Sequence, residues 1–71
     1  MKVVLKEYYI EDSVIRDGMR DAGAKLSKRN YMAVLSNLQD FIEMDCDEVR
    51  RLARDVSRYM LGKGRIEGED D

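Results

Sequence analysis

Apolar side chains recur at helical spacing twice in the second half of the chain. In both stretches they occupy positions i, i+3, i+4 and i+7, which lie on one face of an α-helix. The first stripe consists of Tyr31, Val34, Leu35, Leu38, Phe41 and Ile42. The second stripe consists of Val49, Leu52, Ala53, Val56, Tyr59 and Met60. The pattern predicts two amphipathic helices, over about 28–44 and about 48–61.

Residues that favour helix starts support both helices. Ser27 is a good N-cap for the first, and Leu26 and Tyr31 have the spacing of a hydrophobic staple around it. Asp45 and Glu48 have the spacing of a capping box before the second, with Asp47 as an alternative cap. The sequence therefore predicts where each of these helices begins.

A further helix with a more modest apolar face is predicted over about 13–22. Asp12 or Ser13 is its expected cap, and Gly23 is its expected end. Gly18 lies inside this segment and costs about 1 kcal/mol relative to alanine. The chain is thus expected to form three short helices.

The N-terminal segment 2–10 is rich in β-branched and aromatic residues and is predicted as one β-strand, with a helix as the competing prediction. No second strand is evident except a short one at 65–67. Because a single strand leaves backbone groups unpaired, three arrangements stay open. The strand pairs with its copy in a homodimer, adds to a partner's sheet, or packs on the helices with a minor pairing to the tail.

The expected fold is one mostly α-helical domain over 1–66, with the N-terminal strand followed by the three helices. A chain of 71 residues is one domain at most. Residues 67–71 are four acids and one glycine, and they are predicted to form a disordered acidic tail. The formal net charge of −2 becomes +2 without those four acids, so the domain itself is weakly basic.

The residue types that the chain lacks exclude most enzyme classes. There is no histidine, which is the commonest general base and metal ligand, and the single cysteine is Cys46. The sequence therefore predicts a protein that is not an enzyme and has no catalytic, cofactor-binding or metal-binding residues. No signal peptide or membrane span is expected, and one thiol cannot form a disulfide within the chain, which fits the cytoplasm.

Cations suggest where a partner binds. Lys28 and Arg29 lie in the first turn of a predicted helix, where positive charge is unfavourable unless an anion approaches. Arg50, Arg54 and Arg58 recur at i+4 spacing, whereas Arg51 is expected to pair with nearby acids. Solvated charges are the alternative reading of both groups. The predicted partner-binding residues are Lys2, Val4, Lys6, Tyr8, Lys28, Arg29, Arg50, Arg54 and Arg58.

The size, the net acidity and the order of one strand followed by helices resemble small phage-encoded regulators of bacterial RNA polymerase. That resemblance implies a regulator or inhibitor of transcription that binds a larger protein complex in the cytoplasm of a bacterial host. It implies no cofactor and no individual binding residue, because it rests on general character.

The segment from Gly23 to Tyr31 resembles the turn and second-helix start of ribbon–helix–helix repressors and antitoxins. In that family the strands of two chains pair and enter the major groove. The resemblance implies a homodimer in which Lys2, Val4 and Lys6 face the bases and Lys28 contacts phosphate. The net charge, the third helix and the acidic tail favour the protein-binding regulator over this alternative.

Overall fold

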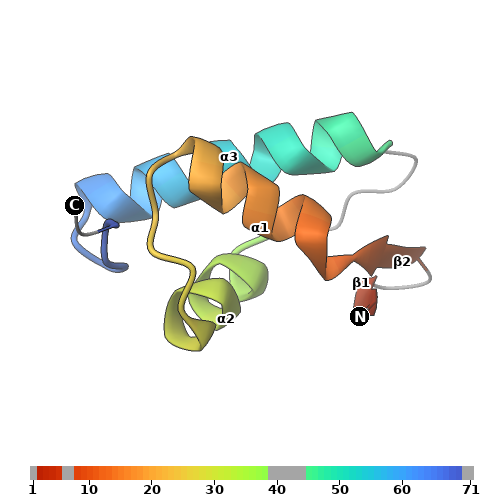
Figure 1. Ribbon diagram of the computed structural model, residues 1–71, viewed down its shortest axis with the longest axis horizontal. Coiled ribbons are helices and arrows are strands. Elements are labelled where there is room, and N and C mark those ends of the chain that lie inside the picture. Colours follow the sequence, from red (N-terminus) through yellow and green to blue (C-terminus); the bar gives the residue numbers. More distant parts are fainter. Residues whose placement is uncertain (1, 6–7, 39–44, 70–71) are drawn as a thin grey trace.

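The computed structural model describes residues 2–5, 8–38 and 45–69 of the chain (Figure 1). Its elements, in chain order, are β1 (Lys2–Leu5), β2 (Tyr8–Glu11), α1 (Asp12–Asp21), α2 (Lys28–Ser36) and α3 (Cys46–Gly62). The expectation of a mostly helical protein with three helices is confirmed. In Figure 1, α1 crosses in front of α3, α2 lies below both, and the strands lie at the end opposite the C-terminus.

The N-terminal segment forms two short strands where the sequence predicted one long strand. β1 and β2 pair antiparallel, and the register sets Lys2 against Glu11 and Leu5 against Tyr8. Two residues separate the strands, which is the commonest length of a hairpin connection. Backbone groups of β1 thus find their partners within the chain. Lys6 lies outside the described residues.

Helix α1 follows β2 directly and begins differently from the prediction. Its N-cap is Glu11, whose side chain accepts no capping hydrogen bond, so neither Asp12 nor Ser13 is the cap. Asp12 instead lies in the first turn, where its negative charge interacts favourably with the helix dipole. It also accepts a hydrogen bond from Arg16. Gly23 ends the helix in a left-handed conformation, with φ of 81°, as the sequence predicted.

Helix α2 has the predicted start but ends early. Ser27 Oγ accepts a hydrogen bond of 3.1 Å from the Asn30 backbone N–H, which confirms the cap. The helix ends at Ser36, where the sequence predicted about 44. Both the Ser36 hydroxyl and the Asn37 amide donate to the Ala33 carbonyl, and such bonds compete with helix continuation. The remainder of the predicted helix, over 39–44, lies outside the described residues.

Helix α3 is the longest element. Asp45 Oδ1 accepts a hydrogen bond of 2.8 Å from the Glu48 backbone N–H, so the predicted capping residue is confirmed and the helix starts at Cys46. Beyond the end of the helix, Gly64 adopts a φ of 70°, and the Arg65 N–H returns to the Met60 carbonyl. The helix therefore spans 46–62 where about 48–61 was predicted.

The core lies where the three helices meet. Its buried apolar residues are Ile15, Met19, Ala24, Tyr31, Val34, Val49, Ala53, Met60 and Ile66. Both predicted stripes contribute, but Tyr59 was wrongly assigned to the core, because its side chain is 57% exposed. Tyr59 lies at the edge of the α3 stripe, so the helix can bury the rest of the stripe without it.

Gly18 lets α1 and α3 approach closely. A methyl group at this position would lie 2.4 Å from the Arg50 carbonyl oxygen and 2.7 Å from Ala53 Cβ. Ser57 of α3 is fully buried, and its hydroxyl donates a hydrogen bond to the Ala53 carbonyl. Small residues therefore line the contact, and the glycine that the sequence marked as a helical weakness is required by packing.

The C-terminal segment is hydrogen-bonded to the rest of the chain through Glu69, whereas the sequence predicted a disordered tail from 67 onward. Asn30 is 2% exposed, and its side-chain amide donates to the carbonyls of Lys25 and Glu67 at 2.9 and 2.7 Å. Its Oδ1 accepts from the Glu67 N–H at 3.2 Å. The Glu69 N–H also donates to the Gly23 carbonyl. These bonds fix the segment against the α1–α2 loop, whereas residues 70–71 lie outside the described residues.

Tyr31 is buried at the contact between α1 and α2. The guanidinium of Arg16 lies 4.5 Å from its ring centroid, and its hydroxyl has no hydrogen-bond partner among the described residues. Burial raises the pKa of Tyr31 above its ordinary value of 10.0, the Asp12 carboxylate raises this pKa further, and Arg16 lowers it in part. The folded state therefore favours the neutral phenol of Tyr31 over the phenolate.

Tyr31→Phe is expected to leave stability unchanged at neutral pH or to raise it by up to about 1 kcal/mol, because it removes an unpaired buried hydroxyl and keeps the ring. The pKa of Tyr31 is higher in the folded state than in the unfolded state. The stability that the neutral phenol contributes below pH 10 is therefore lost as the pH rises through the folded-state pKa. The variant should lose less stability than wild type above pH 10. Urea unfolding at neutral and alkaline pH measures both effects, and a clear loss at neutral pH would show that the hydroxyl has a partner.

Candidate functional site

The predicted partner-binding residues lie on three separate parts of the molecule. Lys2, Val4 and Tyr8 belong to the β1–β2 hairpin, with Tyr8 on a different strand from the other two. Lys28 and Arg29 begin α2, and the arginines lie along α3 (Figure 1). The fold therefore does not gather into one surface those predicted residues that the structure describes.

Arg50 serves the fold of the chain. Its Nη1 donates to Asp21 Oδ2, which joins the start of α3 to the end of α1. Both side chains are partly exposed, so the ion pair adds little stability by itself. The pair does hold the Arg50 guanidinium between α1 and α3 through one nitrogen, so we assign Arg50 to the contact between these helices and not to a partner-binding face.

The remaining arginines of α3 extend along its outer side. Arg54 Nε lies 3.2 Å from Asp55 Oδ1, a pair of adjacent residues that leaves part of the guanidinium open. Arg51 and Arg58 are exposed, and among the described residues no carboxylate lies within 4 Å of either. The predicted pairing of Arg51 with nearby acids is therefore wrong, because Asp55 turns to Arg54. We call Arg51, Arg54 and Arg58 the α3 arginine face.

Lys28 and Arg29 are exposed at the start of α2, as expected, and the first turn of that helix contains no acid. Nearby, Lys25 Nζ lies 3.8 Å from Glu67 Oε2. The C-terminal segment thus brings a carboxylate to this part of the surface. The local positive charge of the α2 start is accordingly lower than the sequence alone indicated.

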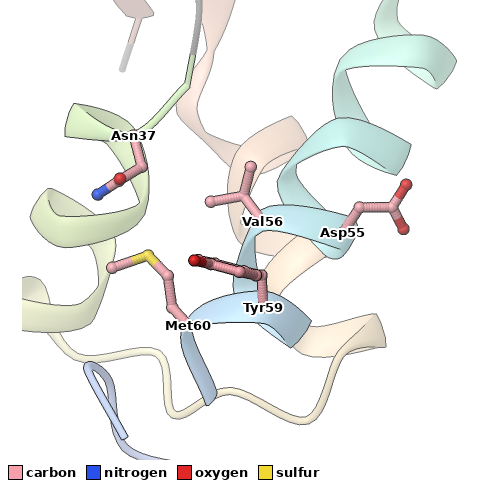
Figure 2. A pocket seen from close by; sticks show the side chains of 5 residues that line it. All are labelled: Asn37, Asp55, Val56, Tyr59 and Met60. Atoms are coloured by element: carbon pink, nitrogen blue, oxygen red, sulfur yellow. The ribbon is translucent and has the colours of Figure 1, made fainter. Parts of the chain in front are cut away.

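A hollow of about 320 Å³ opens between α2 and α3. It is lined by Asn37, Asp55, Val56, Tyr59 and Met60 (Figure 2). In Figure 2 the Tyr59 and Met60 side chains lie beside each other below Asn37, and the Asp55 carboxylate points away from α2. Sequence reasoning missed this feature because Tyr59 fits the buried stripe. The early end of α2 at Ser36 was also needed to see it, because Asn37 is its C-cap.

Lysine and tyrosine meet at the rim of this hollow. Lys63 Nζ lies 5.7 Å from the ring centroid of Tyr59, within the range of a cation–π interaction. Arg58 precedes Tyr59 in the chain and is exposed. Lys63 thus lies over the exposed ring of Tyr59, and Arg58 is a second exposed cation next to Tyr59 in the chain.

The described part of the chain contains no group of three or more His, Cys, Asp or Glu side chains that could hold a metal ion. Cys46 is exposed at the start of α3. Within the described ranges, no helix is both long enough and apolar enough to cross a membrane.

Comparison with known proteins gives no relative for this chain. No protein-family model matches the sequence, no curated protein is significantly similar to it, and no solved structure matches the fold at the same level of significance. The functional argument therefore rests on the residues and their geometry.

Proposed function

We propose that the protein is a small, non-enzymatic regulator that binds an acidic surface of a larger protein through the α3 arginine face. The observation that carries the proposal is the exposure of Arg51 and Arg58 without a carboxylate within 4 Å in the described residues. Guanidinium groups of this kind pair with carboxylates in two-pronged geometry. Rows of such groups on one helix suit a protein surface that offers several acids.

Capture from a bacterial lysate tests this proposal. The immobilised wild-type protein should retain a large protein, and Arg51→Glu combined with Arg58→Glu should release it. Both residues are exposed, so the double variant should unfold within about 0.5 kcal/mol of wild type. Arg29→Glu with Arg65→Glu makes the same charge change away from this face and should keep the partner. Loss of the partner in the control pair but not in the α3 pair would contradict the proposal.

Bacterial RNA polymerase is the first partner to test, on the strength of the resemblance in size, acidity and element order. Purified polymerase should bind the wild-type protein and slow transcription from a standard promoter in vitro. If the α3 double variant binds polymerase as tightly as wild type does, polymerase does not bind through the α3 arginine face. The absence of any binding would remove the polymerase and leave the wider proposal of an acidic protein partner.

The ribbon–helix–helix alternative receives less support from the fold. That family needs β1 to pair with the same strand of a second chain, whereas here β1 pairs with β2 of its own chain. We therefore expect a monomer by light scattering, and duplex DNA binding no tighter than about 10⁻⁴ M at physiological salt. Submicromolar, salt-steep and sequence-selective binding in a fluorescence anisotropy titration would favour the DNA-binding function.

A further inference from the structure

The hollow between α2 and α3 combines an apolar lining with an exposed aromatic ring. Val56 and Met60 form its inner wall with the ring of Tyr59, whose side chain is 57% exposed. Single exposed apolar residues are common on protein surfaces. A concave site that holds such a ring against two apolar neighbours is the kind of place that receives an anchor side chain.

The charges around the hollow define what such an anchor must carry. Lys63 lies over the Tyr59 ring, and Arg58, the residue of α3 that precedes Tyr59, has no acid within 4 Å in the described residues. Asp55 is the acid of the lining, and Arg54 already lies 3.2 Å from its Oδ1. Among the described residues, the charges near Tyr59 that no carboxylate compensates are therefore positive, which favours carboxylates on the approaching segment.

We propose that the hollow receives an apolar side chain of a partner protein, carried on a segment with acids on both sides of that side chain. The proposal rests on the proposed function, because the same segment would bring its acids to Arg58 and the α3 arginine face. The apolar side chain covers Val56, Tyr59 and Met60, and the flanking carboxylates approach Lys63 and Arg58. In many small recognition sites an apolar anchor provides much of the affinity, and charged residues around it orient the bound segment.

A labelled peptide tests the proposal directly. The probe is a short fluorescein-labelled peptide in which a central leucine–phenylalanine pair is flanked by glutamates, and binding is followed by anisotropy. Tyr59→Ala should weaken binding at least about tenfold, or about 1.4 kcal/mol. Met32→Ala is the matched control, because Met32 is 52% exposed and does not line the hollow. Arg58→Glu should weaken binding by a similar factor, with Arg20→Glu as its control.

Two comparison peptides decide the outcome. A peptide with serines in place of the apolar pair, or with lysines in place of the glutamates, should bind at least about tenfold more weakly. Equal binding by the serine peptide, unaffected by Tyr59→Ala, would overturn the role of the hollow and leave the arginine face as the binding surface. Binding by none of the peptides would overturn the inference, while capture of a lysate partner would still test the proposed function separately. Tyr59-dependent dimerisation in light scattering would show that a second copy occupies the hollow.

Discussion

Gly18→Ala is expected to lower the free energy of unfolding by about 3 kcal/mol, although alanine is the better helix former. The added methyl group would meet the Arg50 carbonyl oxygen at 2.4 Å and the Arg54 backbone nitrogen at 2.9 Å. Both are main-chain atoms of α3, so no side-chain rotation relieves the contact. The two helices must move apart, and the buried contact between Ile15, Met19 and α3 loosens with them.

Gly62→Ala is the matched control for this substitution. Gly62 is also helical, but a methyl group there would meet no atom within 4 Å. Alanine should therefore leave stability unchanged or raise it by less than about 1 kcal/mol, through helix propensity alone. Urea unfolding followed by circular dichroism measures both variants. Equal and favourable effects at the two positions would show that α1 and α3 do not approach as described.

Asn30→Ala is expected to destabilise the protein by about 2–4 kcal/mol, because three partly buried hydrogen bonds lose their side-chain partner. The site offers two carbonyl acceptors, from Lys25 and Glu67, and one donor, the Glu67 N–H. An asparagine amide matches that set, and an aspartate carboxylate does not, since it cannot donate to the carbonyls. Asn30→Asp should therefore fail to restore stability. Asn37→Ala, an exposed asparagine bonded to the Ala33 carbonyl, should cost about 1 kcal/mol or less.

Ending the chain after Ile66 removes two of these three bonds from the other side, those to Glu67, and leaves the bond to the Lys25 carbonyl. A truncated protein should lose about as much stability as Asn30→Ala, and the two changes together should cost little more than either alone. Thermal unfolding of the four proteins in this cycle measures the coupling. Strictly additive losses, or a truncated chain as stable as wild type, would show that the C-terminal segment does not depend on Asn30.

The two helix starts could be read from the sequence because they depend on local chemistry. Ser27 and Asp45 each bond to a backbone N–H three residues later, so spacing alone predicts them. The end of α2 was not predictable in the same way. The apolar pattern continues past Ser36, and only local competition for the Ala33 carbonyl shows that the helix ends there.

Long-range contacts explain the other differences. The sequence shows that Asn30 is polar in a helix, but its bonds to Glu67 join residues far apart in the chain. The same holds for Gly18, whose packing partner lies on α3. In the candidate site, the distinction between Arg50, which is paired with Asp21, and Arg58 also needs the tertiary fold. Spacing along α3 predicted the row of arginines and could not show which of them remain available.

The most direct test of the proposed function is to map where a captured partner contacts the protein. Amide hydrogen exchange should be measured on the free protein and on its complex with that partner, with purified bacterial RNA polymerase examined first. The account predicts that protection increases along α3 and at its end, from Arg51 through Arg58 to Lys63, and changes little at the start of α2. Protection centred on Lys28 and Arg29, or on β1 and β2 with α3 unchanged, would contradict it.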